Sequence, residues 1–237
     1  MAGINRVNNL MYALKNNHQW FVHDSFEKAS MAAATLLAEK INASIENNGF
    51  CHIILPGGNS PIQCLSFLID RALPWDKINW YLSDERCYPL GHVNRNDVML
   101  QKNLWSKISQ TTVFSIPTEL GAEEAAKQYR KIVDRVSRFD IAFLGLGEDG
   151  HTASLFPNND ALQDTRSVIP VFNAPKAPDT RVSLSIETLA NAKFRMVLTG
   201  GKTKADAISK IKNGATLPIN CLGDITWHVD SSAVKKG

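Results

Sequence analysis

The stretch Cys51–Gln63, which reads CHIILPGGNSPIQ, contains one complete strand–loop–helix unit. Its first five residues are mainly apolar and include two β-branched isoleucines, which predicts a strand buried on both faces. Two glycines, Gly57 and Gly58, then predict a tight loop. Ser60 follows as the expected N-cap of a helix, with a proline at the first helical position and a glutamine three residues after the cap. A buried strand that leads directly into a helix is the building block of an α/β fold.

The same alternation of apolar strands and amphipathic helices extends to both sides of this unit. Further strands are expected at residues 20–22, 78–82, 139–144, 168–172, 181–186, 194–198 and 226–229. Further helices are expected from near Ser25, with Asp24 or Ser25 as its cap, to Gly49, over residues 122–136 and over residues 202–212. The pattern predicts a mainly parallel sheet with helices on both faces, in which ligands bind at the carboxyl ends of the strands.

Length and composition favour one globular unit. The chain has 237 residues, 44% of them hydrophobic, so it can bury a sizeable core. The sequence has no internal repeat, and its richest loop, residues 173–180, is too short to separate two domains. We therefore expect a single domain over residues 1–237. Residues 1–18 indicate no function.

Charge and cysteine patterns narrow the class of protein. The formal net charge is only +3, with Lys and Arg scattered along the chain, which argues against a nucleic-acid partner. No window approaches the roughly 20 apolar residues that span a bilayer. Residues 1–19 lack the apolar run of a signal peptide, so the expected location is the cytoplasm. The four cysteines have no C-x-x-C spacing, which suits reduced thiols.

Two of the expected strands end in loops that could bind a phosphorylated ligand. In the first loop, Gly57, Gly58 and Asn59 precede a helix start that offers free N–H groups and the positive end of a helix dipole. In the second loop, Arg86 could bind phosphate oxygens, while Asp84 could accept from sugar hydroxyls or hold Arg86. A structural ion pair or a cluster of solvated charges would give the same run of charged residues in this second loop.

A third loop, residues 145–157, reads GLGEDGHTASLFP and follows the expected strand 139–144. Its glycines let the backbone approach a ligand closely. His151 can take and return a proton near neutral pH, and Asp149 could orient its ring or favour its protonated form. We expect His151 and Asp149 to be catalytic; the alternative is a structural histidine.

Several familiar motifs are missing from the sequence. It has no G-x-S-x-G nucleophile elbow, no phosphate-binding P-loop motif and no His–Cys cluster with zinc spacing. The glycines of residues 145–150 match G-x-G-x-x-G in form, but the acidic residue of a dinucleotide site, expected about 20 residues later, is not evident. We therefore expect neither a metal nor an organic cofactor.

Together the three loops resemble those of the 6-phosphogluconolactonase family, over most of the chain from the first helix to Trp227. Family members carry L-S-G-G-S-T-P, D-E-R and G-x-G-x-D-G-H-T-A-S-L-F-P, where this chain has LPGGNSP at residues 55–61, DER at 84–86 and the full third motif at 145–157. The departures are Pro56, Asn59 and Ser60 in the first loop and Arg95 where the family has a serine before Asn96.

Two later segments extend the resemblance. Pro178-x-x-Arg181 resembles a segment whose arginine contacts substrate, and Gly200-Gly201-x-x-Lys204 resembles a Gly–Lys element that contacts phosphate. Lys202 is the other residue of this chain that could align with the lysine of the family. A closing Trp227-x-x-Asp230 pattern also fits.

The resemblance implies a three-layer αβα sandwich with a mainly parallel, Rossmann-like sheet, shared with amino-sugar-phosphate isomerase-deaminases and ribose-5-phosphate isomerase. It implies hydrolysis of 6-phospho-D-glucono-1,5-lactone, a step of the oxidative pentose phosphate pathway, by a water molecule that His151 activates. The substrate-binding and phosphate-binding residues it implies are Gly57, Gly58, Asn59, Asp84, Arg86, Arg181 and Lys204. The implied partner is the phosphorylated sugar lactone alone, with the protein a monomer or a small homo-oligomer.

Two other functions fit part of the pattern. An amino-sugar-phosphate isomerase-deaminase would share the D-G-H loop, but those relatives place an Asn and a Glu shortly after the His, where this chain has Leu155 and Phe156. A phenylalanine cannot supply the carboxylate that moves protons between carbons. A non-catalytic sugar-phosphate-binding regulator is the second alternative. The intact Asp149 and His151 argue against it.

Overall fold

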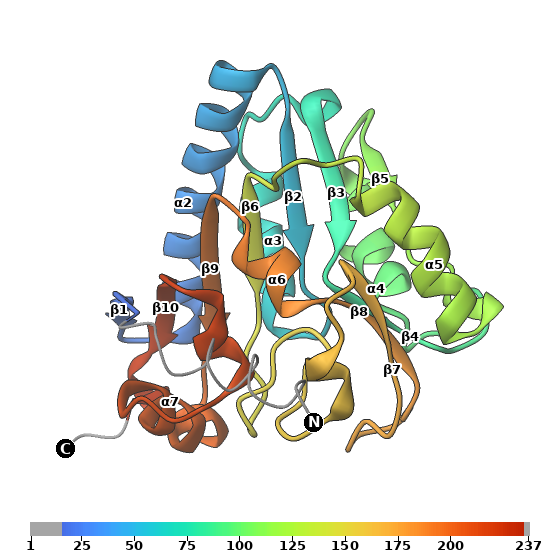
Figure 1. Cartoon of the computed structure of the whole chain (residues 1–237). Coiled ribbons are helices and arrows are strands. Elements are labelled where there is room, and N and C mark those ends of the chain that lie inside the picture. The colour runs from blue at the N-terminus through green and yellow to red at the C-terminus, as the bar shows by residue number, and fades with distance from the viewer. Residues whose placement is uncertain (1–15, 235–237) are drawn as a thin grey trace.

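A computed structural model describes residues 16–234; residues 1–15, most of the segment without an expected function, lie outside the described residues, as do residues 235–237. The central sheet of the described chain runs in the order β1-β10-β9-β6-β2-β3-β5, and every neighbouring pair is parallel (Figure 1). The strands are β1 Gln19–His23, β2 Cys51–Leu55, β3 Ile78–Leu82, β5 Thr112–Phe114, β6 Ile141–Leu144, β9 Phe194–Thr199 and β10 Thr226–Asp230.

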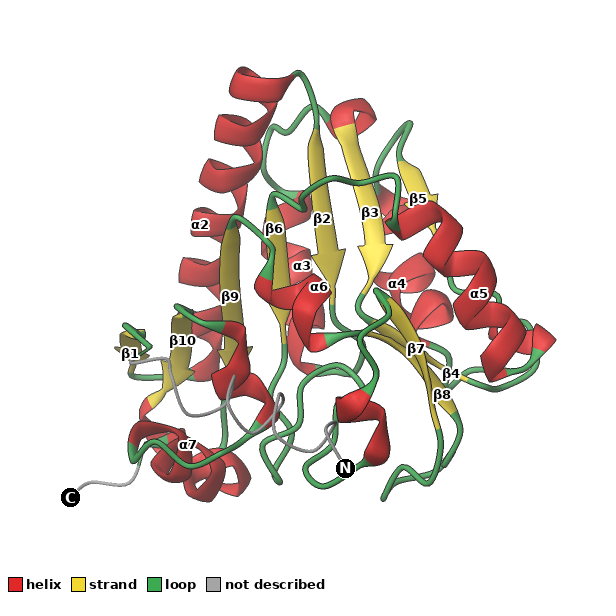
Figure 2. Ribbon diagram, in the orientation of Figure 1, coloured by secondary structure: helices red, strands yellow, loops and turns green. Residues whose placement is uncertain are grey.

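Helices cover both faces of this sheet, which confirms the expected three-layer α/β architecture. Helices α2 (Phe26–Asn48) and α3 (Ser60–Ile69) pack against each other behind the sheet, and α6 (Ile186–Ala190) lies in front of it (Figures 1 and 2). The remaining α-helices of the described chain are α4 Asn96–Asn103, α5 Ala122–Val133 and α7 Ala205–Lys212.

The first helix begins and ends where its sequence predicts. The side chain of Ser25 caps α2 by accepting from the backbone N–H of Lys28 at 3.2 Å. Gly49 ends the helix with φ at 83°, a left-handed conformation that glycine adopts without steric strain. Its buried face is rich in alanine, so α2 can approach its neighbours closely.

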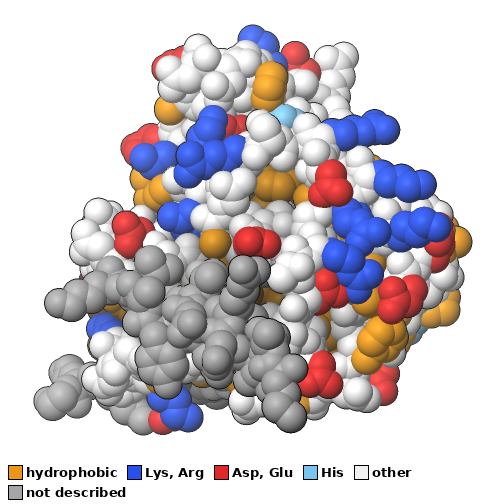
Figure 3. Space-filling view, viewed as in Figure 1, with side chains coloured by type: hydrophobic (Ala, Val, Ile, Leu, Met, Phe, Trp, Pro, Cys, Tyr) orange, Lys and Arg blue, Asp and Glu red, His pale blue; other side chains and the backbone are white. Residues whose placement is uncertain are grey.

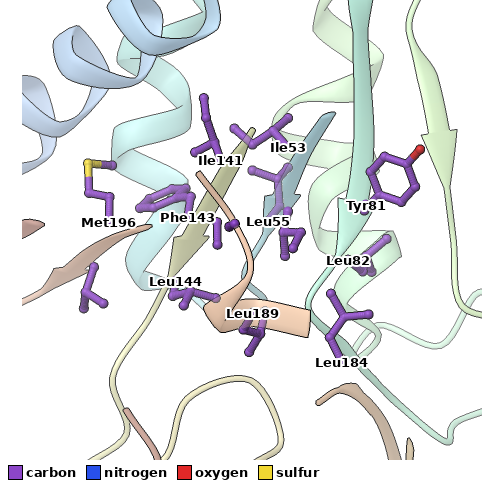
Figure 4. Close-up of a cluster of buried hydrophobic side chains, with 14 of the residues drawn as sticks. Ile53, Leu55, Tyr81, Leu82, Ile141, Phe143, Leu144, Leu184, Leu189 and Met196 are labelled. Carbon is purple, nitrogen blue, oxygen red and sulfur yellow. The ribbon is translucent and has the colours of Figure 1, made fainter. Parts of the chain in front are cut away.

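The core lies between the sheet and its two helical layers. Figure 4 shows Ile53 and Leu55 of β2 beside Phe143 of β6, with Leu189 of α6 in front of them. All four side chains are buried. At about 25 cal/mol per Å² of apolar surface, burying one such side chain stabilises the fold by roughly 1.5–3 kcal/mol. The central strands are therefore rigid supports for the loops at their carboxyl ends.

A second, antiparallel sheet in the order β4-β8-β7 was not expected. It consists of β4 Asp84–Arg86, β8 Arg181–Leu184 and β7 Val168–Val171. The prediction that residues 84–86 form a loop was wrong, because these charged residues pair with β8. The strand expected to reach residue 186 ends at Leu184, because Ser185 caps α6 by accepting from the N–H of Thr188.

Two further predictions about helices need correction. Ser60 is not the N-cap of α3: Asn59 occupies that position, with no side-chain cap, and Ser60 starts the helix. The side chain of Gln63 accepts from Ser30 Oγ of α2, at 3.4 Å, in place of closing a capping box. Helix α5 ends at Val133, three residues before the expected end.

The surface in Figure 3 carries Lys and Arg side chains interspersed with Asp and Glu, in line with the scattered charges of the sequence. Within residues 16–234, no helix combines the length and the apolar character needed to cross a bilayer.

Candidate active site

A cavity of about 460 Å³ opens at the carboxyl ends of β2, β3 and β6, the edge of the sheet at which the sequence predicts ligand binding. The loops that follow these three strands line it, together with β4, the start of α4, the segment before β8 and the first residue of β8, and the short helix that ends at Lys204. The lining residues are Pro56, Gly57, Gly58, Ser60, Ser83, Asp84, Arg86, Tyr88, Asn94, Asn96, Gly145, Leu146, Gly147, His151, Thr152, Ala153, Lys176, Ala177, Arg181 and Lys204.

Most of the candidate residues from the sequence meet in this cavity. Those that line it are Gly57, Gly58, Asp84, Arg86, His151, Arg181 and Lys204. Asn59 is exposed and lies outside the lining, and so does Lys202. Of the two alignments for the Gly–Lys element, the one with Lys204 therefore brings the lysine to the cavity. Asp149 does not line the cavity, but it is hydrogen-bonded to His151, which does.

His151 and Asp149 form a hydrogen-bonded pair. The distance from His151 Nδ1 to Asp149 Oδ1 is 2.5 Å, and the backbone N–H of His151 donates to the same oxygen at 3.2 Å. Partial burial alone would raise the pKa of Asp149, but the hydrogen bond and the charge of His151 lower this pKa to about 2. Asp149 is therefore ionised at neutral pH and holds the imidazole by Nδ1.

The glycines of the third loop leave room for this pair. The N–H of Gly147 donates to the carbonyl oxygen of His151 at 2.7 Å. A Cβ atom at residue 147 would stand 1.9 Å from His151 Nδ1, closer than any real contact. Thr152 Oγ1 donates to the carbonyl of Gly145 at 3.0 Å and closes the loop. The position of the His151 ring therefore requires a glycine at residue 147.

Phe156 links His151 to Arg181. Its ring is buried, with its centroid 4.5 Å from that of the imidazole, and the Arg181 guanidinium carbon lies 5.3 Å from the same centroid. The guanidinium also donates to the carbonyls of Lys176 and Pro178, at 2.9 and 3.1 Å. The Phe156 ring on one side and the loop before β8 on the other therefore hold the Arg181 guanidinium in place.

Asp84 and Arg86 have separate partners. Asp84 is buried and accepts from Ser83 Oγ at 2.9 Å and from Ser154 Oγ at 2.6 Å. Arg86 Nη1 donates to the carbonyl of Asn94 at 2.8 Å, and its buried Nε has no hydrogen-bond partner within the described chain. Within the described chain no ion pair joins Asp84 to Arg86. The alternative in which Asp84 holds Arg86 in place therefore does not apply.

The register of the second sheet places two arginines on one rung. Arg86 of β4 is directly opposite Arg181 of β8, and paired residues of antiparallel strands project to the same face. The other basic lining residues are Lys176 and Lys204, and the acidic one is Asp84. Four cationic side chains against one carboxylate make the cavity suited to an anionic ligand.

Lys204 ends a short 3-10 helix, Lys202–Lys204, that follows Gly201. The N–H of Gly201 donates to both carboxylate oxygens of Asp230, at 3.2 and 3.1 Å. Asp230, at the carboxyl end of β10, thereby fixes the turn that carries Lys204. Burial lowers the pKa of Lys204, while the charges of Glu148 and Asp149 act in the opposite direction.

Sequence reasoning missed several lining residues. Tyr88, Asn94 and Lys176 come from irregular segments whose path no periodicity reveals. Asn96 had a signal, since it is the retained Asn of the family's Ser-Asn pair; its Nδ2 donates to the carbonyl of Asp84 at 2.8 Å. Within residues 16–234, no three His, Cys, Asp or Glu side chains gather in a way that could hold a metal ion.

Comparison with known proteins gives a consistent result. The family model described as glucosamine-6-phosphate isomerases/6-phosphogluconolactonase matches residues 24–227. A probable 6-phosphogluconolactonase of Arabidopsis thaliana is 30% identical over 261 residues, covering 96% of each chain. The structure of 6-phosphogluconolactonase from Trypanosoma cruzi superposes with a TM-score of 0.83 at 26% identity, covering 94% of this chain and 98% of the other.

A monomeric glucosamine-6-phosphate deaminase shares the fold, with a TM-score of 0.79 at 21% identity, covering 91% of this chain and 98% of the other. Overall shape therefore does not separate the two activities in the family name. With the family model matched over residues 24–227 and the near-full-length similarity to the Arabidopsis thaliana relative, the chain belongs to the glucosamine-6-phosphate isomerase/6-phosphogluconolactonase family.

Proposed function

We propose that this protein hydrolyses 6-phospho-D-glucono-1,5-lactone to 6-phospho-D-gluconate, with His151 as general base. The observation that carries the proposal is the His151–Asp149 pair at the rim of a cationic cavity, beside a phenylalanine where an isomerase would need a carboxylate. The named relatives among lactonases support the same choice.

The hydrogen bond to Asp149 supports one assignment of the proton on His151. Because the Asp149 carboxylate accepts hydrogen bonds only, Nδ1 is the protonated nitrogen of the neutral imidazole and Nε2 has a free lone pair. Nε2 is then the atom that takes a proton from water. The carboxylate also stabilises the imidazolium that forms.

The proposed reaction has two proton transfers. A water molecule attacks the lactone carbonyl carbon as His151 Nε2 takes one of its protons, giving a tetrahedral oxyanion. The bond from that carbon to the ring oxygen then breaks, and the imidazolium returns the proton to the departing oxygen. The product is an open-chain acid with one new hydroxyl group, and His151 is restored to its neutral form.

Basic groups have two tasks in this scheme. Arg86, Lys204 and the N–H groups of the Gly57–Gly58 turn would hold the phosphate. Arg181, which contacts the same Phe156 ring as His151, would stabilise the oxyanion. Asp84, which lines the cavity, would accept from sugar hydroxyls in addition to the two serine hydroxyls that it binds already.

Phe156 argues against the isomerase-deaminase alternative. It is buried against the imidazole and the Arg181 guanidinium and offers no group that takes up a proton. The small net charge of +3 supports a small-molecule partner over a nucleic acid. The single domain, the cytoplasmic location and the oligomeric state stay predictions.

The decisive experiment measures lactone loss against its spontaneous rate, with His151→Ala as the test variant. We expect His151→Ala to lose about 10²–10⁴-fold in turnover, or roughly 3–5 kcal/mol of transition-state stabilisation. His52→Ala, at the amino end of β2, is the matched control and keeps turnover. Wild-type turnover in His151→Ala would refute the base assignment, and ammonia release from glucosamine 6-phosphate would favour the deaminase.

A further inference from the structure

We infer that Glu85 is a positioning residue: its buried carboxylate fixes Arg86 and Asn96 on the cavity wall by accepting backbone hydrogen bonds from both. The inference rests on the proposed function, because it concerns how the anionic part of the substrate is held. Glu85 does not line the cavity itself.

The side chain of Glu85 is fully buried and points away from the cavity. Its neighbours on β4, Asp84 and Arg86, both line the cavity, and successive residues of a strand project to opposite faces. Oε1 accepts from the N–H groups of Arg86 and Asn96, at 2.8 and 2.7 Å, and Oε2 accepts from that of Asp97 at 2.8 Å. One carboxylate thus joins β4 to the first turn of α4.

Asn96 extends this connection to the glycine loop. Its Nδ2 donates to the Asp84 carbonyl at 2.8 Å, and its side chain fills the space beside Gly57, where a Cβ atom would stand 2.1 Å from Asn96 Oδ1. Glu85 therefore sets the relative positions of β4, the start of α4 and the Gly57 turn. These three segments carry groups that would surround the phosphate.

The Glu85 carboxylate is buried without an ion-pair partner in the described chain, which is costly. Burial raises the pKa of Glu85 to about 7, although the backbone N–H groups of Asn96, Arg86 and Asp97 act in the opposite direction. No Lys or Arg side chain forms an ion pair with Glu85 in the described chain; its partners are backbone donors. Such perturbed groups next to a cavity are concentrated at functional sites.

The test compares Glu85→Gln with a matched control. An amide has one acceptor oxygen and an NH₂ donor, so it cannot accept from three N–H groups in the directions that the carboxylate serves. Asp140→Asn is the control: Asp140 is also buried and accepts from a backbone N–H, that of His52 at 2.8 Å, but it precedes β6 at the opposite end of the sheet.

For Glu85→Gln we expect KM for the phosphorylated lactone to rise about tenfold, with kcat changed by less than about twofold. Asp140→Asn should lower the melting temperature without moving KM. Arg86→Ala is the positive reference, with a KM increase at least as large. A wild-type KM in Glu85→Gln, or an equal KM increase in Asp140→Asn, would overturn the inference.

A binding measurement separates this inference from the proposed function. By calorimetry, inorganic phosphate should bind Glu85→Gln about tenfold more weakly than it binds the wild type and Asp140→Asn. If the wild type does not hydrolyse the lactone but phosphate binding depends on Glu85, the proposed function fails and the positioning role stands. If the wild type hydrolyses the lactone and phosphate binds Glu85→Gln normally, only the positioning role fails.

Discussion

Replacing Gly147 by alanine tests whether the exact place of the imidazole controls the reaction. The backbone of residue 147 does not require a positive φ, so alanine brings no conformational strain of that kind. Its Cβ would stand 1.9 Å from His151 Nδ1, and ordinary contact begins at 3.4 Å, so the ring must move by about 1.5 Å. That movement breaks the 2.5 Å hydrogen bond to Asp149.

The expected loss in Gly147→Ala is about 10²-fold in kcat, because displacement of a catalytic group by about 1 Å has an effect of that size. KM should change little, since the groups assigned to the phosphate stay in place. The assay is lactone hydrolysis corrected for the spontaneous rate, with the melting temperature measured alongside to confirm that the variant is folded.

A double variant makes this test stricter. In His151→Ala the space beside residue 147 is free, so adding Gly147→Ala should produce no further loss. Two outcomes would refute the steric reasoning: wild-type turnover in Gly147→Ala, or losses that simply multiply in the double variant.

Two further predictions concern a lysine and a histidine elsewhere in the fold. In steady-state kinetics Lys204→Ala should raise KM for the phosphorylated lactone about tenfold or more. Lys202 lies outside the cavity, so Lys202→Ala should change KM by less than about twofold. Equal changes in KM for the two variants would show that Lys204 does not bind the phosphate. Burial, aided by the charge of His23, lowers the pKa of His228 from 6.5 to about 4. The unfolded chain takes up this proton near pH 6.5, whereas the folded chain takes it up only near pH 4. The contribution of His228 to the free energy of unfolding is therefore fully retained above pH 6.5 and falls by at most about 3 kcal/mol as the pH drops to about 4. Urea unfolding at several pH values should show a smaller fall for His228→Gln, and an unchanged fall would contradict the assignment.

The sequence predicted the central strands well, because burial on both faces leaves near-continuous apolar runs such as 51–55 and 141–144. It did not predict α4, whose buried residues are only Asn96 and Leu100, so no apolar stripe marks the helix. It also missed β5, a three-residue edge strand without a fully buried side chain. Both elements depend on tertiary contacts that leave no local pattern.

The candidate site was predictable where a residue lies in the segment that follows a buried central strand, as Asp84 and Arg86 do after β3 and His151 does after β6. Antiparallel pairing of β4 with β8 could not be foreseen, because charged residues such as those of β4 are poor strand formers in general. The side-chain role expected for Asn59 also lacked a basis in geometry: a residue at a helix N-cap can face solvent, as this one does.

The rung that pairs Arg86 with Arg181 has a consequence for how the protein behaves in solution. Like charges directly opposite each other on an antiparallel ladder repel, and burial together with the charge of Arg86 lowers the pKa of Arg181. In the proposed function the phosphate lies against Arg86 and the oxyanion against Arg181, so an anionic ligand would add counter-charge beside this rung. Ligand affinity and thermal stability would then be thermodynamically linked. We therefore expect sulfate or phosphate in a buffer to stabilise the protein and to compete with the substrate, and we expect added neutral salt to weaken both effects by screening the charges.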